Sequence, residues 1–204
     1  MSFFTDRHTK KIVILLGHPD SGQTRSGELA LLYEVSAKKA GHEVKRFNVG
    51  EMRFDPILHQ GYKVIQELEP DLKLLQEAIK WADHLVIIYP NWWGTMPALL
   101  KGLFDRMWLP GFCFNYYKEG VLGHFSFWNR KMVGKTARVI VLSATKPLFI
   151  WMLFGDYTNE IYKNILWFAG FKARVTRFGP SEKSPEWKWN EWRRRVSNLG
   201  RLGE

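Results

Sequence analysis

The stretch His84–Trp108 reads HLVIIYPNWWGTMPALLKGLFDRMW, and the interpretation of the whole chain starts from it. Its first seven residues are mostly apolar and end at a proline, which is typical of a buried β-strand. From Met96 onward the apolar residues have helical spacing. A short turn that contains Trp92, Trp93 and Gly94 joins the two parts. A buried strand that turns directly into a helix is the repeating unit of parallel sheets.

The same alternation of strand and helix continues on both sides of this unit. Gly41 is expected to end the first helix, because glycine readily takes the backbone conformation that follows a helix. Asp71 and Ser184 are expected to cap the second and the last helix, with Pro185 at the first helical position. The patterns predict strands at residues 10–17, 42–49, 84–90, 137–144 and 172–178, and helices at 24–41, 71–82, 96–108, 159–170 and 184–200.

This order of elements predicts a parallel sheet with helices on both faces. Five strands with this spacing suit an α/β, flavodoxin-like three-layer sandwich with strand order 2-1-3-4-5. Residues 1–204 would form a single domain, in which residues 1–10 are flexible and residues 184–204 form a closing helix and tail. Sheets of this type bind ligands at the carboxyl ends of their strands, so the loops after the first, third and fourth strands are the ones to examine.

The composition narrows the class of protein. A net charge of +10 suits an anionic partner, such as a nucleic acid, a membrane surface or a phosphorylated small molecule, or it is simply a solvated surface. Ten tryptophans suggest flat ligand surfaces or a subunit interface. Cys113 is the single cysteine, so an intrachain disulfide is excluded, and we interpret it as a core residue. With no signal peptide and no apolar run near ~20 residues, we expect a cytoplasmic protein without a transmembrane segment.

The loop after the first strand reads GHPDSGQTRSG and leads into a helix N-terminus. Free backbone N–H groups and the helix dipole favour an anion at such a position. The loop has neither the glycine pattern of a dinucleotide fold nor the lysine of a P-loop. It is therefore either a phosphate-binding loop or an ordinary capped helix start. The candidate phosphate-binding residues are His18, Ser21, Thr24, Arg25 and Ser26.

The loop after the third strand reads YPNWWGTMP. Its prolines restrict the backbone, and Gly94 permits backbone angles that other residues avoid. The two tryptophans either contact a flat ligand or cover the edge of the sheet. The candidate ligand-binding residues here are Pro90, Asn91, Trp92, Trp93 and Gly94.

The loop after the fourth strand begins with Ser143, Ala144 and Thr145, which are further candidates for binding a ligand. The run LFIWMLF follows, and it forms either an apolar wall of a substrate pocket, a buried core helix or a helix at a dimer interface. Asp156 and Tyr157 lie beyond it. Together the three loops would bring an anion site, an aromatic surface and hydroxyl groups to one edge of the sheet. A flavin mononucleotide (FMN) fits this combination, with its phosphate on the first loop and its ring on the other two.

The sequence also resembles a known family. The stretches LGHPDSGQTRSGELA and WADHLVIIYPNWWGTMPALLKGLFDRMWLPGFCF, with the spacing between them, are similar to flavodoxin-like NAD(P)H:quinone oxidoreductases. These include bacterial NAD(P)H-dependent flavin oxidoreductases and the reductase subunits of glutathione-gated potassium efflux systems. The second stretch is the more specific, because it matches the family's order of Pro, Trp, Pro-Ala, Leu-Lys-Gly and an acidic-Arg pair. The resemblance covers about residues 11–180.

The resemblance implies a tightly held flavin. It assigns the phosphate to His18, Thr24, Arg25 and Ser26, with Ser21 as a further candidate, and the ring edge to residues 90–93. The chain departs from the family in the loop after the fourth strand. The family usually has Thr-Thr-Gly-Gly there, whereas residues 144–147 of this chain read Ala-Thr-Lys-Pro. Loss of both glycines argues against a close backbone approach to the flavin there. The family's Tyr and His beside the flavin have no clear counterpart, and Tyr157 is the candidate catalytic residue.

These observations lead to one main hypothesis about function. The protein would be a flavoenzyme, an NAD(P)H dehydrogenase (quinone), that passes hydride from NADPH or NADH through FMN, or alternatively FAD, to a quinone-like acceptor. No metal is required. The resemblance also implies a homodimer, with GFCFNYY and PLFIWMLF as candidate contacts. A flavodoxin-type one-electron carrier and a flavin-binding regulatory subunit are the alternatives.

Two groups of charged residues are interpreted as surface features. Lys101, Asp105 and Arg106 have helical spacing and are expected to form an exposed ion-pair network. The three arginines at 193–195 point in different directions on a helix, beside an apolar seam. We therefore do not expect a nucleic-acid partner.

Overall fold

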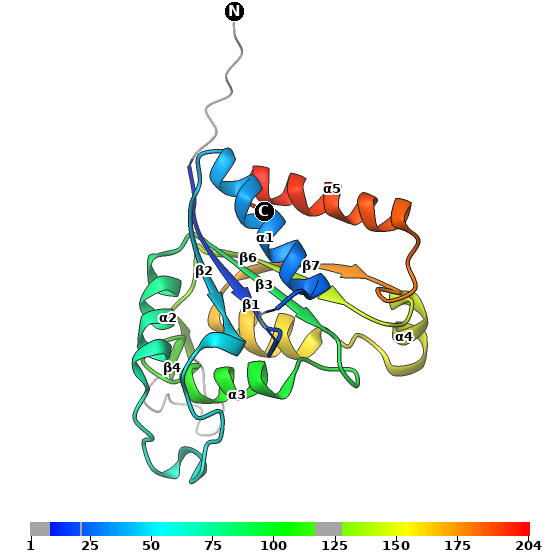
Figure 1. The fold of residues 1–204 in the computed structure, drawn as a ribbon. Helices are drawn as coiled ribbons and strands as arrows, with labels where there is room; N and C mark the ends of the chain where they lie inside the picture. The colour runs from blue at the N-terminus through cyan, green and yellow to red at the C-terminus, as the bar shows by residue number, and fades with distance from the viewer. Residues whose placement is uncertain (1–8, 21, 117–127) are drawn as a thin grey trace, which may run out of the picture.

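The centre of the molecule is a parallel five-stranded sheet (Figure 1). The structure of the protein is a computed structural model, which describes residues 9–20, 22–116 and 128–204. The chain order of its strands is β1 (Lys11–Leu16), β2 (Glu43–Asn48), β3 (His84–Pro90), β6 (Thr136–Leu142) and β7 (Lys172–Phe178). Neighbouring strands in the sheet follow the order β2-β1-β3-β6-β7. All five expected strands are therefore confirmed.

The order differs from the expected 2-1-3-4-5 because the chain contains two further strands. β4 (Phe114–Tyr116) and β5 (Trp128–Arg130) pair antiparallel in a sheet of their own. They lie between β3 and β6 in the chain, so the last two strands of the main sheet become β6 and β7. Strands of three residues carry too little periodicity to be predicted from sequence.

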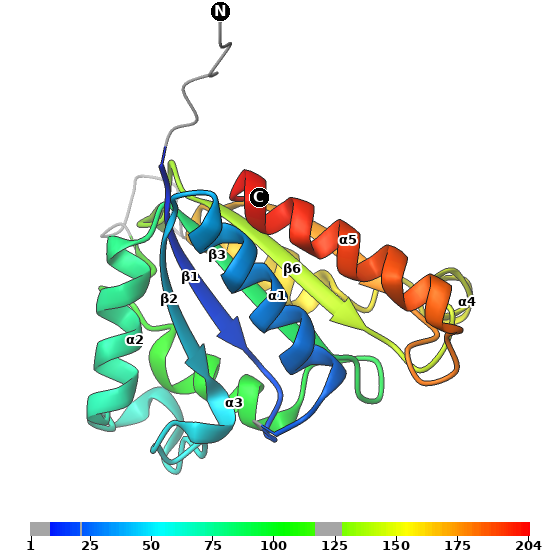
Figure 2. The same cartoon turned by 45° about the horizontal axis from the view of Figure 1, so that its top comes forward.

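Helices cover both faces of the sheet. α1 (Arg25–Lys39) and α5 (Glu186–Leu202) lie side by side on one face, as Figure 2 shows. The other face is covered by α2 (Pro70–Trp81), α3 (Ala98–Met107) and the π-helix η3 (Glu160–Trp167). Two short 3-10 helices, Val49–Glu51 and Gly61–Lys63, interrupt the connection from β2 to α2. The three layers match the expected sandwich.

The apolar strands divide the core in two. Ile12, Ile14 and Leu16 of β1 face α1 and α5, whereas Val13 and Leu15 face the helices of the other layer. All five of these side chains are fully buried. A central strand that is buried on both faces needs an unbroken apolar run, which is why these strands could be recognised from sequence.

The two predicted helix caps are wrong. Asp71 lies inside α2, and its carboxylate accepts a hydrogen bond of 2.6 Å from the backbone N–H of Arg53. Ser184 donates its hydroxyl to the carbonyl of Pro180 at 2.5 Å, and α5 begins only after Pro185. In both places the polar side chain stabilises the incoming loop rather than the helix end.

The expected ion-pair network on α3 is half confirmed. Lys101 and Asp105 pair at 2.6 Å on the surface. Arg106, however, has a fully buried side chain that forms two 3.0 Å hydrogen bonds to the Glu69 carboxylate. It also donates to the carbonyls of Asp55 and Glu67, so it anchors the loop before α2. Helical spacing indicated the neighbours of Arg106 on its own helix, but not the loop that covers it.

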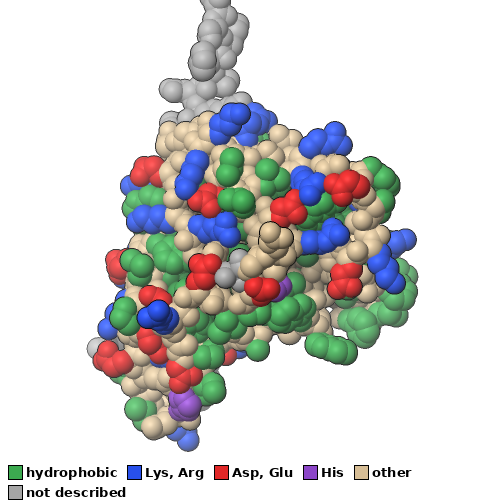
Figure 3. All heavy atoms as spheres, in the orientation of Figure 1, with side chains coloured by type: hydrophobic (Ala, Val, Ile, Leu, Met, Phe, Trp, Pro, Cys, Tyr) green, Lys and Arg blue, Asp and Glu red, His purple; other side chains and the backbone are tan. Residues whose placement is uncertain are grey.

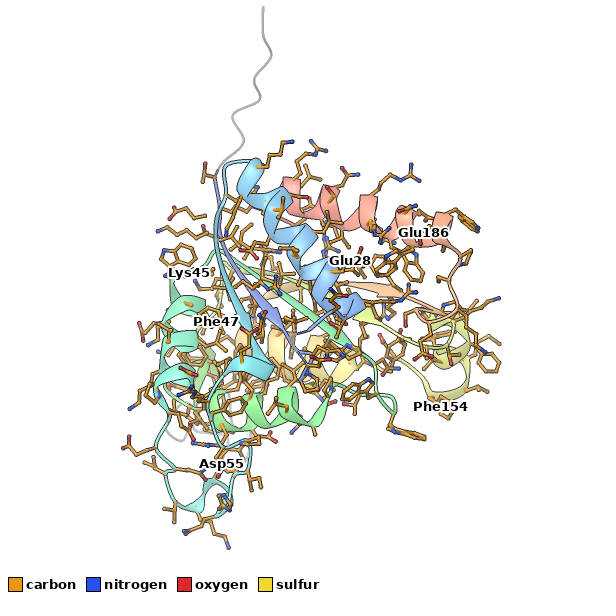
Figure 4. All side chains as sticks on the ribbon, in the orientation of Figure 1. Glu28, Lys45, Phe47, Asp55, Phe154 and Glu186 are labelled. Carbon is orange, nitrogen blue, oxygen red and sulfur yellow. The ribbon has the colours of Figure 1, made fainter. Side chains whose placement is uncertain are left out.

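The helix α4 (Pro147–Phe154) follows β6 and contributes only Ile150 to the core of this chain. Six of its eight residues are apolar and more than half exposed, and only Ile150 is buried. Figure 3 shows hydrophobic side chains gathered at this edge, and Figure 4 shows Phe154 directed away from the body of the molecule. Within the described ranges, the structure has no helix with the length and apolar character that crossing a bilayer requires.

Candidate functional site

The carboxyl ends of β1, β3 and β6 meet at one edge of the sheet. Backbone hydrogen bonds join them: Gly17 donates to Ile88 at 2.8 Å, and Asn91 donates to Leu142 at 2.7 Å. The three loops that the sequence singled out therefore start side by side. This follows from the strand order: β1, β3 and β6 are neighbouring parallel strands, so their carboxyl ends lie at the same edge of the sheet.

The first loop is held by its own polar groups. Asp20 accepts from the backbone N–H of Gly22 at 2.7 Å, and His18 Nδ1 accepts from the N–H of Asp20 at 3.0 Å. The Thr24 hydroxyl caps α1 by accepting from the N–H of Gly27 at 3.0 Å. The N–H groups of Arg25 and Ser26, the first two helical residues, have no acceptor inside the helix and are available to an anion. Ser21 lies outside the described residues.

Two of the candidate phosphate-binding side chains are directed elsewhere. The Arg25 guanidinium lies 4.7 Å from the centre of the Trp189 ring on α5, where a cation–π contact holds it. Ser26 is only 2% exposed. A cavity of about 490 Å³ lies beside the helix start; it is lined by Gly22, Gln23, Thr24, Arg25, Gly27, Glu28, Leu31 and Arg46. Backbone groups and Thr24 are thus the anion donors that the helix start offers.

The loop after β3 is a tight hairpin turn. Trp92 and Thr95 exchange two backbone hydrogen bonds, of 3.0 and 3.1 Å. The two residues between them both have positive φ angles, 53° at Trp93 and 82° at Gly94. This is the pattern of a type I′ turn, in which glycine is favoured and a tryptophan is strained. The Trp93 side chain is completely exposed.

This turn lies against the first loop. The rings of His18 and Trp92 meet edge to face, with centres 5.5 Å apart. Beside them Asn91 has a buried side-chain oxygen, Oδ1, without a hydrogen-bond partner among the described residues. A buried acceptor of this kind fits a ligand that brings an N–H group to it. The turn therefore offers an aromatic surface and an unsatisfied polar atom next to the anion site.

The loop after β6 starts between the loop after β3 and the end of β7, because β6 lies between β3 and β7 in the sheet. Ser143 is fully buried, and its hydroxyl donates to the Tyr157 hydroxyl at 3.3 Å. Ala144 and Thr145 are exposed at the edge. Tyr157 is 8% exposed, and burial raises the pKa of its hydroxyl. Tyr157 is thus placed behind the loop rather than at the surface of the site.

Two side-chain contacts at this edge of the sheet were not predicted from the sequence. Arg177 of β7 donates to both carboxylate oxygens of Asp156, at 2.7 and 2.8 Å, and to the hydroxyl of Thr158 at 2.6 Å. Thr95 donates its hydroxyl to the carboxylate of Glu160, which joins the hairpin turn to η3. These partners are 19 to 65 positions apart in the chain. Local periodicity contains no signal for such pairs.

Several oxidoreductases are similar to this chain in sequence. An uncharacterised NAD(P)H oxidoreductase of Haemophilus influenzae is 30% identical over 105 residues, which cover 50% of this chain and 52% of that protein. The NAD(P)H dehydrogenase [quinone] 1 of Cavia porcellus is 27% identical, with 61% and 51% covered. The chain thus spans about half the length of these curated relatives.

Solved structures extend the similarity over nearly the whole chain. The Smu.1420 protein of Streptococcus mutans is 26% identical, with a TM-score of 0.78 and coverage of 93% of this chain and 98% of that one. The NAD(P)H:quinone oxidoreductase of Methanothermobacter marburgensis is 23% identical, with a TM-score of 0.79 and coverage of 96% and 100%. The second likeness concerns the fold alone.

A family model supports the same assignment. It is described as a flavodoxin-like fold, and it matches residues 10–195. That range includes the complete sheet, the three loops at its carboxyl edge and most of α5. The sheet topology and this match agree, and the chain belongs to the flavodoxin-like fold family.

Proposed function

We propose that this protein is a flavin-dependent oxidoreductase that carries electrons from NADPH or NADH to a quinone or a similar electrophile. One observation supports this above the others: the free N-terminus of α1 and the exposed tryptophan turn meet at one edge, through the contact of His18 with Trp92. An anion site beside an aromatic turn suits a phosphorylated planar cofactor. The names of the relatives from Haemophilus influenzae and Cavia porcellus point to the same chemistry.

In this proposal each part of the edge has a separate task. Thr24 and the first N–H groups of α1 would hold the phosphate of FMN, and the turn at Trp92–Thr95 would contact the ring. Asn91 Oδ1 would be the acceptor for an N–H group of the ring. When bound there, the flavin would supply two-electron transfer between the nicotinamide and the acceptor. FAD is the alternative cofactor, since the cavity beside Arg46 offers further space.

The side chains around the edge also determine how the acceptor enters. Trp93 extends into solvent from a strained turn, so it can close over a flat partner that lies on the ring. A slot of this kind admits one planar molecule at a time, and donor and acceptor would alternate. Initial rates should then give parallel double-reciprocal plots, whereas converging lines would show both substrates bound together.

We also propose that the protein is a cytoplasmic homodimer. The exposed apolar face of α4 is the expected contact, together with Gly111 and Tyr116 of the second predicted segment, whose residues Phe112, Cys113 and Phe114 are buried within the chain. Tyr117, which belonged to the predicted contact, lies outside the described residues. A second copy would cover α4 and complete the acceptor pocket. Cys113 is buried and pairs with no second cysteine, in keeping with a reducing compartment.

The cofactor proposal can be tested with one pair of variants. The purified protein should be yellow, and heat should release FMN that chromatography identifies. Thr24→Ala removes a hydroxyl from the phosphate site, and a hydrogen bond to a charged group is worth about 1.5–3 kcal/mol. Its flavin dissociation constant should therefore rise at least about tenfold.

Thr24→Ser is the matched control, because it keeps the hydroxyl and the helix cap. It should bind flavin like the wild type. Equal flavin affinity in Thr24→Ala and the wild type would place the phosphate elsewhere. Flavin binding without any oxidation of NADPH or NADH would favour the electron carrier or the regulatory subunit.

A further inference from the structure

A second group of charged residues lies at the opposite end of the sheet, where β6 and β7 begin. Arg138 of β6 and Arg174 of β7 are direct partners in the parallel register, and Thr136 is paired with Lys172 in the same way. Like charges on paired positions of neighbouring strands repel each other and destabilise a sheet. This row of cations therefore needs negative charge nearby.

Arg138 is the buried member of this row, and its hydrogen bonding is incomplete. It is 7% exposed, its Nε has no partner, and its Nη1 makes a single long bond of 3.4 Å to the Thr176 hydroxyl. Arg106, also buried, offers an internal comparison: its Nε lacks a partner in the described residues as well, but it makes four hydrogen bonds to two carbonyls and one carboxylate. A buried guanidinium has five N–H donors, so Arg138 retains capacity for an acceptor.

A cavity of about 220 Å³ adjoins these residues. It is lined by Lys10, His84, Thr136, Ala137, Arg138, Lys172, Arg174, Gly203 and Glu204. His84 is 3% exposed; its Nδ1 lies 2.7 Å from the Thr136 hydroxyl, and its Nε2 has no partner in the described part of the chain. Two side chains that are nine-tenths buried thus border the cavity with unsatisfied nitrogens.

The negative charge inside the cavity comes from Glu204. Its carboxylate lies 3.6 Å from both Arg138 and Arg174, too far for a hydrogen bond. Four cations line the cavity, and facing them are the side-chain carboxylate of Glu204 and the main-chain oxygen of the same residue, which accepts a hydrogen bond from the Tyr33 hydroxyl at 3.2 Å. Positive charge remains in excess. The same field affects His84: burial first, and then Lys10 and Arg138, lower the pKa of its ring to about 3.

We propose that this cavity binds a small multivalent oxyanion, either orthophosphate or the phosphate group of a small phosphomonoester. Arg138 and Arg174 bind its oxygens, and Lys10 and Lys172 add to the field. One water occupies ~30 Å³ in the liquid, so the cavity has room for a phosphate and a few waters. The site lies at the amino-terminal ends of the strands, so it is separate from the flavin edge. In the absence of the oxyanion, the Glu204 carboxylate is a weak counter-ion for the two arginines, and the bound oxyanion displaces it.

Calorimetric titration with sodium phosphate tests this at constant ionic strength. The full chain is purified without phosphate, and the variants below separate this cavity from the start of α1. Orthophosphate should bind and should raise the melting temperature, because a ligand of the native state stabilises it. Loss of one charged hydrogen bond predicts at least about tenfold weaker binding in Arg174→Gln, whose side chain is 73% exposed and tolerates replacement.

Three more variants make the result decisive. Arg138→Met should abolish binding, and Glu204→Gln should tighten it because the internal competitor is lost. Lys63→Gln removes one exposed positive charge from the loop before α2 and should bind phosphate like the wild type. If Arg138→Met does not fold, Arg174→Gln decides. A wild type that binds no phosphate, or equal affinity in Arg174→Gln and Lys63→Gln, overturns the proposal. Tighter binding of glycerol 3-phosphate than of orthophosphate would identify a phosphomonoester as the ligand.

Discussion

Trp93 combines a strained backbone with a fully exposed side chain. Its φ of 53° belongs to the left-handed region, which costs an ordinary L-residue roughly 1 kcal/mol. Its side chain is completely exposed, so packing within the chain does not offset this cost. Strain that persists without local compensation points to selection for another role. We infer that the role is contact with a ligand that lies along the turn.

The first prediction concerns this residue. Trp93→Gly relieves the strain, although the more flexible unfolded chain cancels part of the gain. Its free energy of unfolding should equal or exceed that of the wild type by up to about 1 kcal/mol, while acceptor turnover or flavin retention falls. Urea unfolding and steady-state kinetics measure the two effects. A variant with lower stability and unchanged turnover would show that Trp93 has no role in binding a ligand.

At the scale of the helix, α3 contains two ion pairs in contrasting surroundings. Lys101 and Asp105 pair in solvent, whereas Arg106 is buried against Glu69. Breaking a buried pair leaves polar groups without partners, which costs about 3–5 kcal/mol. Glu69 keeps some contact with water, since its side chain is 29% exposed, and this places the expected cost near the lower limit.

The second prediction compares the two pairs. Arg106→Met should lower the free energy of unfolding by about 3 kcal/mol. Lys101→Gln, on the same helix, should lower it by less than about 1 kcal/mol, because solvent screens the exposed pair. Chemical denaturation of both variants gives the comparison. Equal losses would contradict the assignment of Arg106 as the anchor of the loop before α2.

The helix α4 shows what its apolar sequence becomes without a partner in the chain. Phe149, Trp151 and Phe154 are each more than half exposed. Aromatic side chains bury about 150–250 Å² each, so these three alone expose on the order of 300 Å². The largest apolar patch of a typical monomer is about 300–600 Å², and the exposed side chains of Leu148, Met152 and Leu153 extend this one further.

The third prediction is that α4 lies in the dimer interface. The wild type should sediment as a dimer at micromolar concentration. The double variant Phe149→Ser and Phe154→Ser should shift it to monomer and keep the fold, because neither side chain is buried in the chain. Trp187→Ser removes an equally exposed ring from α5 and should remain a dimer. A monomeric wild type would refute the homodimer itself.

At the scale of the whole molecule, the ion pairs Arg106–Glu69 and Arg177–Asp156 link segments that are distant in the chain. The carboxylate of each pair takes up a proton in acid. Burial raises the pKa of Glu69, but hydrogen bonds from Asp55 and Arg106 outweigh it and hold the pKa below its ordinary value. Burial likewise raises the pKa of Asp156, and bonds from Thr158 and Arg177 hold it low. Both carboxylates thus bind protons more weakly in the folded state than in the unfolded chain.

The fourth prediction follows from this sign. Unfolded carboxyl groups titrate near pH 4, so the stability from the two pairs is complete above that pH. It is lost as the pH falls through the lower values of the folded state. The urea midpoint of the wild type should therefore fall steeply below pH 4, and that of the Glu69→Gln and Asp156→Asn double variant should fall less. Parallel curves would mean that other groups control acid unfolding.

The sequence by itself determined the elements and the edge at which the site is built. Each strand of the main sheet is an apolar run or an alternating pattern, because burial on one or both faces demands it. The alternation and spacing of strands and helices suit a flavodoxin-like parallel sheet, and in its strand order the loops after β1, β3 and β6 meet at one edge. The turn with Trp92 to Gly94 was recognisable from its glycine and prolines.

Only the tertiary structure decided which polar groups meet. Arg106 reaches Glu69, Arg25 reaches Trp189, Arg177 reaches Asp156, and Arg138 lies beside Arg174. Each partner comes from a different element, and the choice depends on register and helix rotation, which shift with small changes in packing. Periodicity reports whether a residue faces the core or the solvent, but it contains no information about the side chain opposite. The apolar framework is therefore local in origin, whereas the charges acquire their roles when the layers come together.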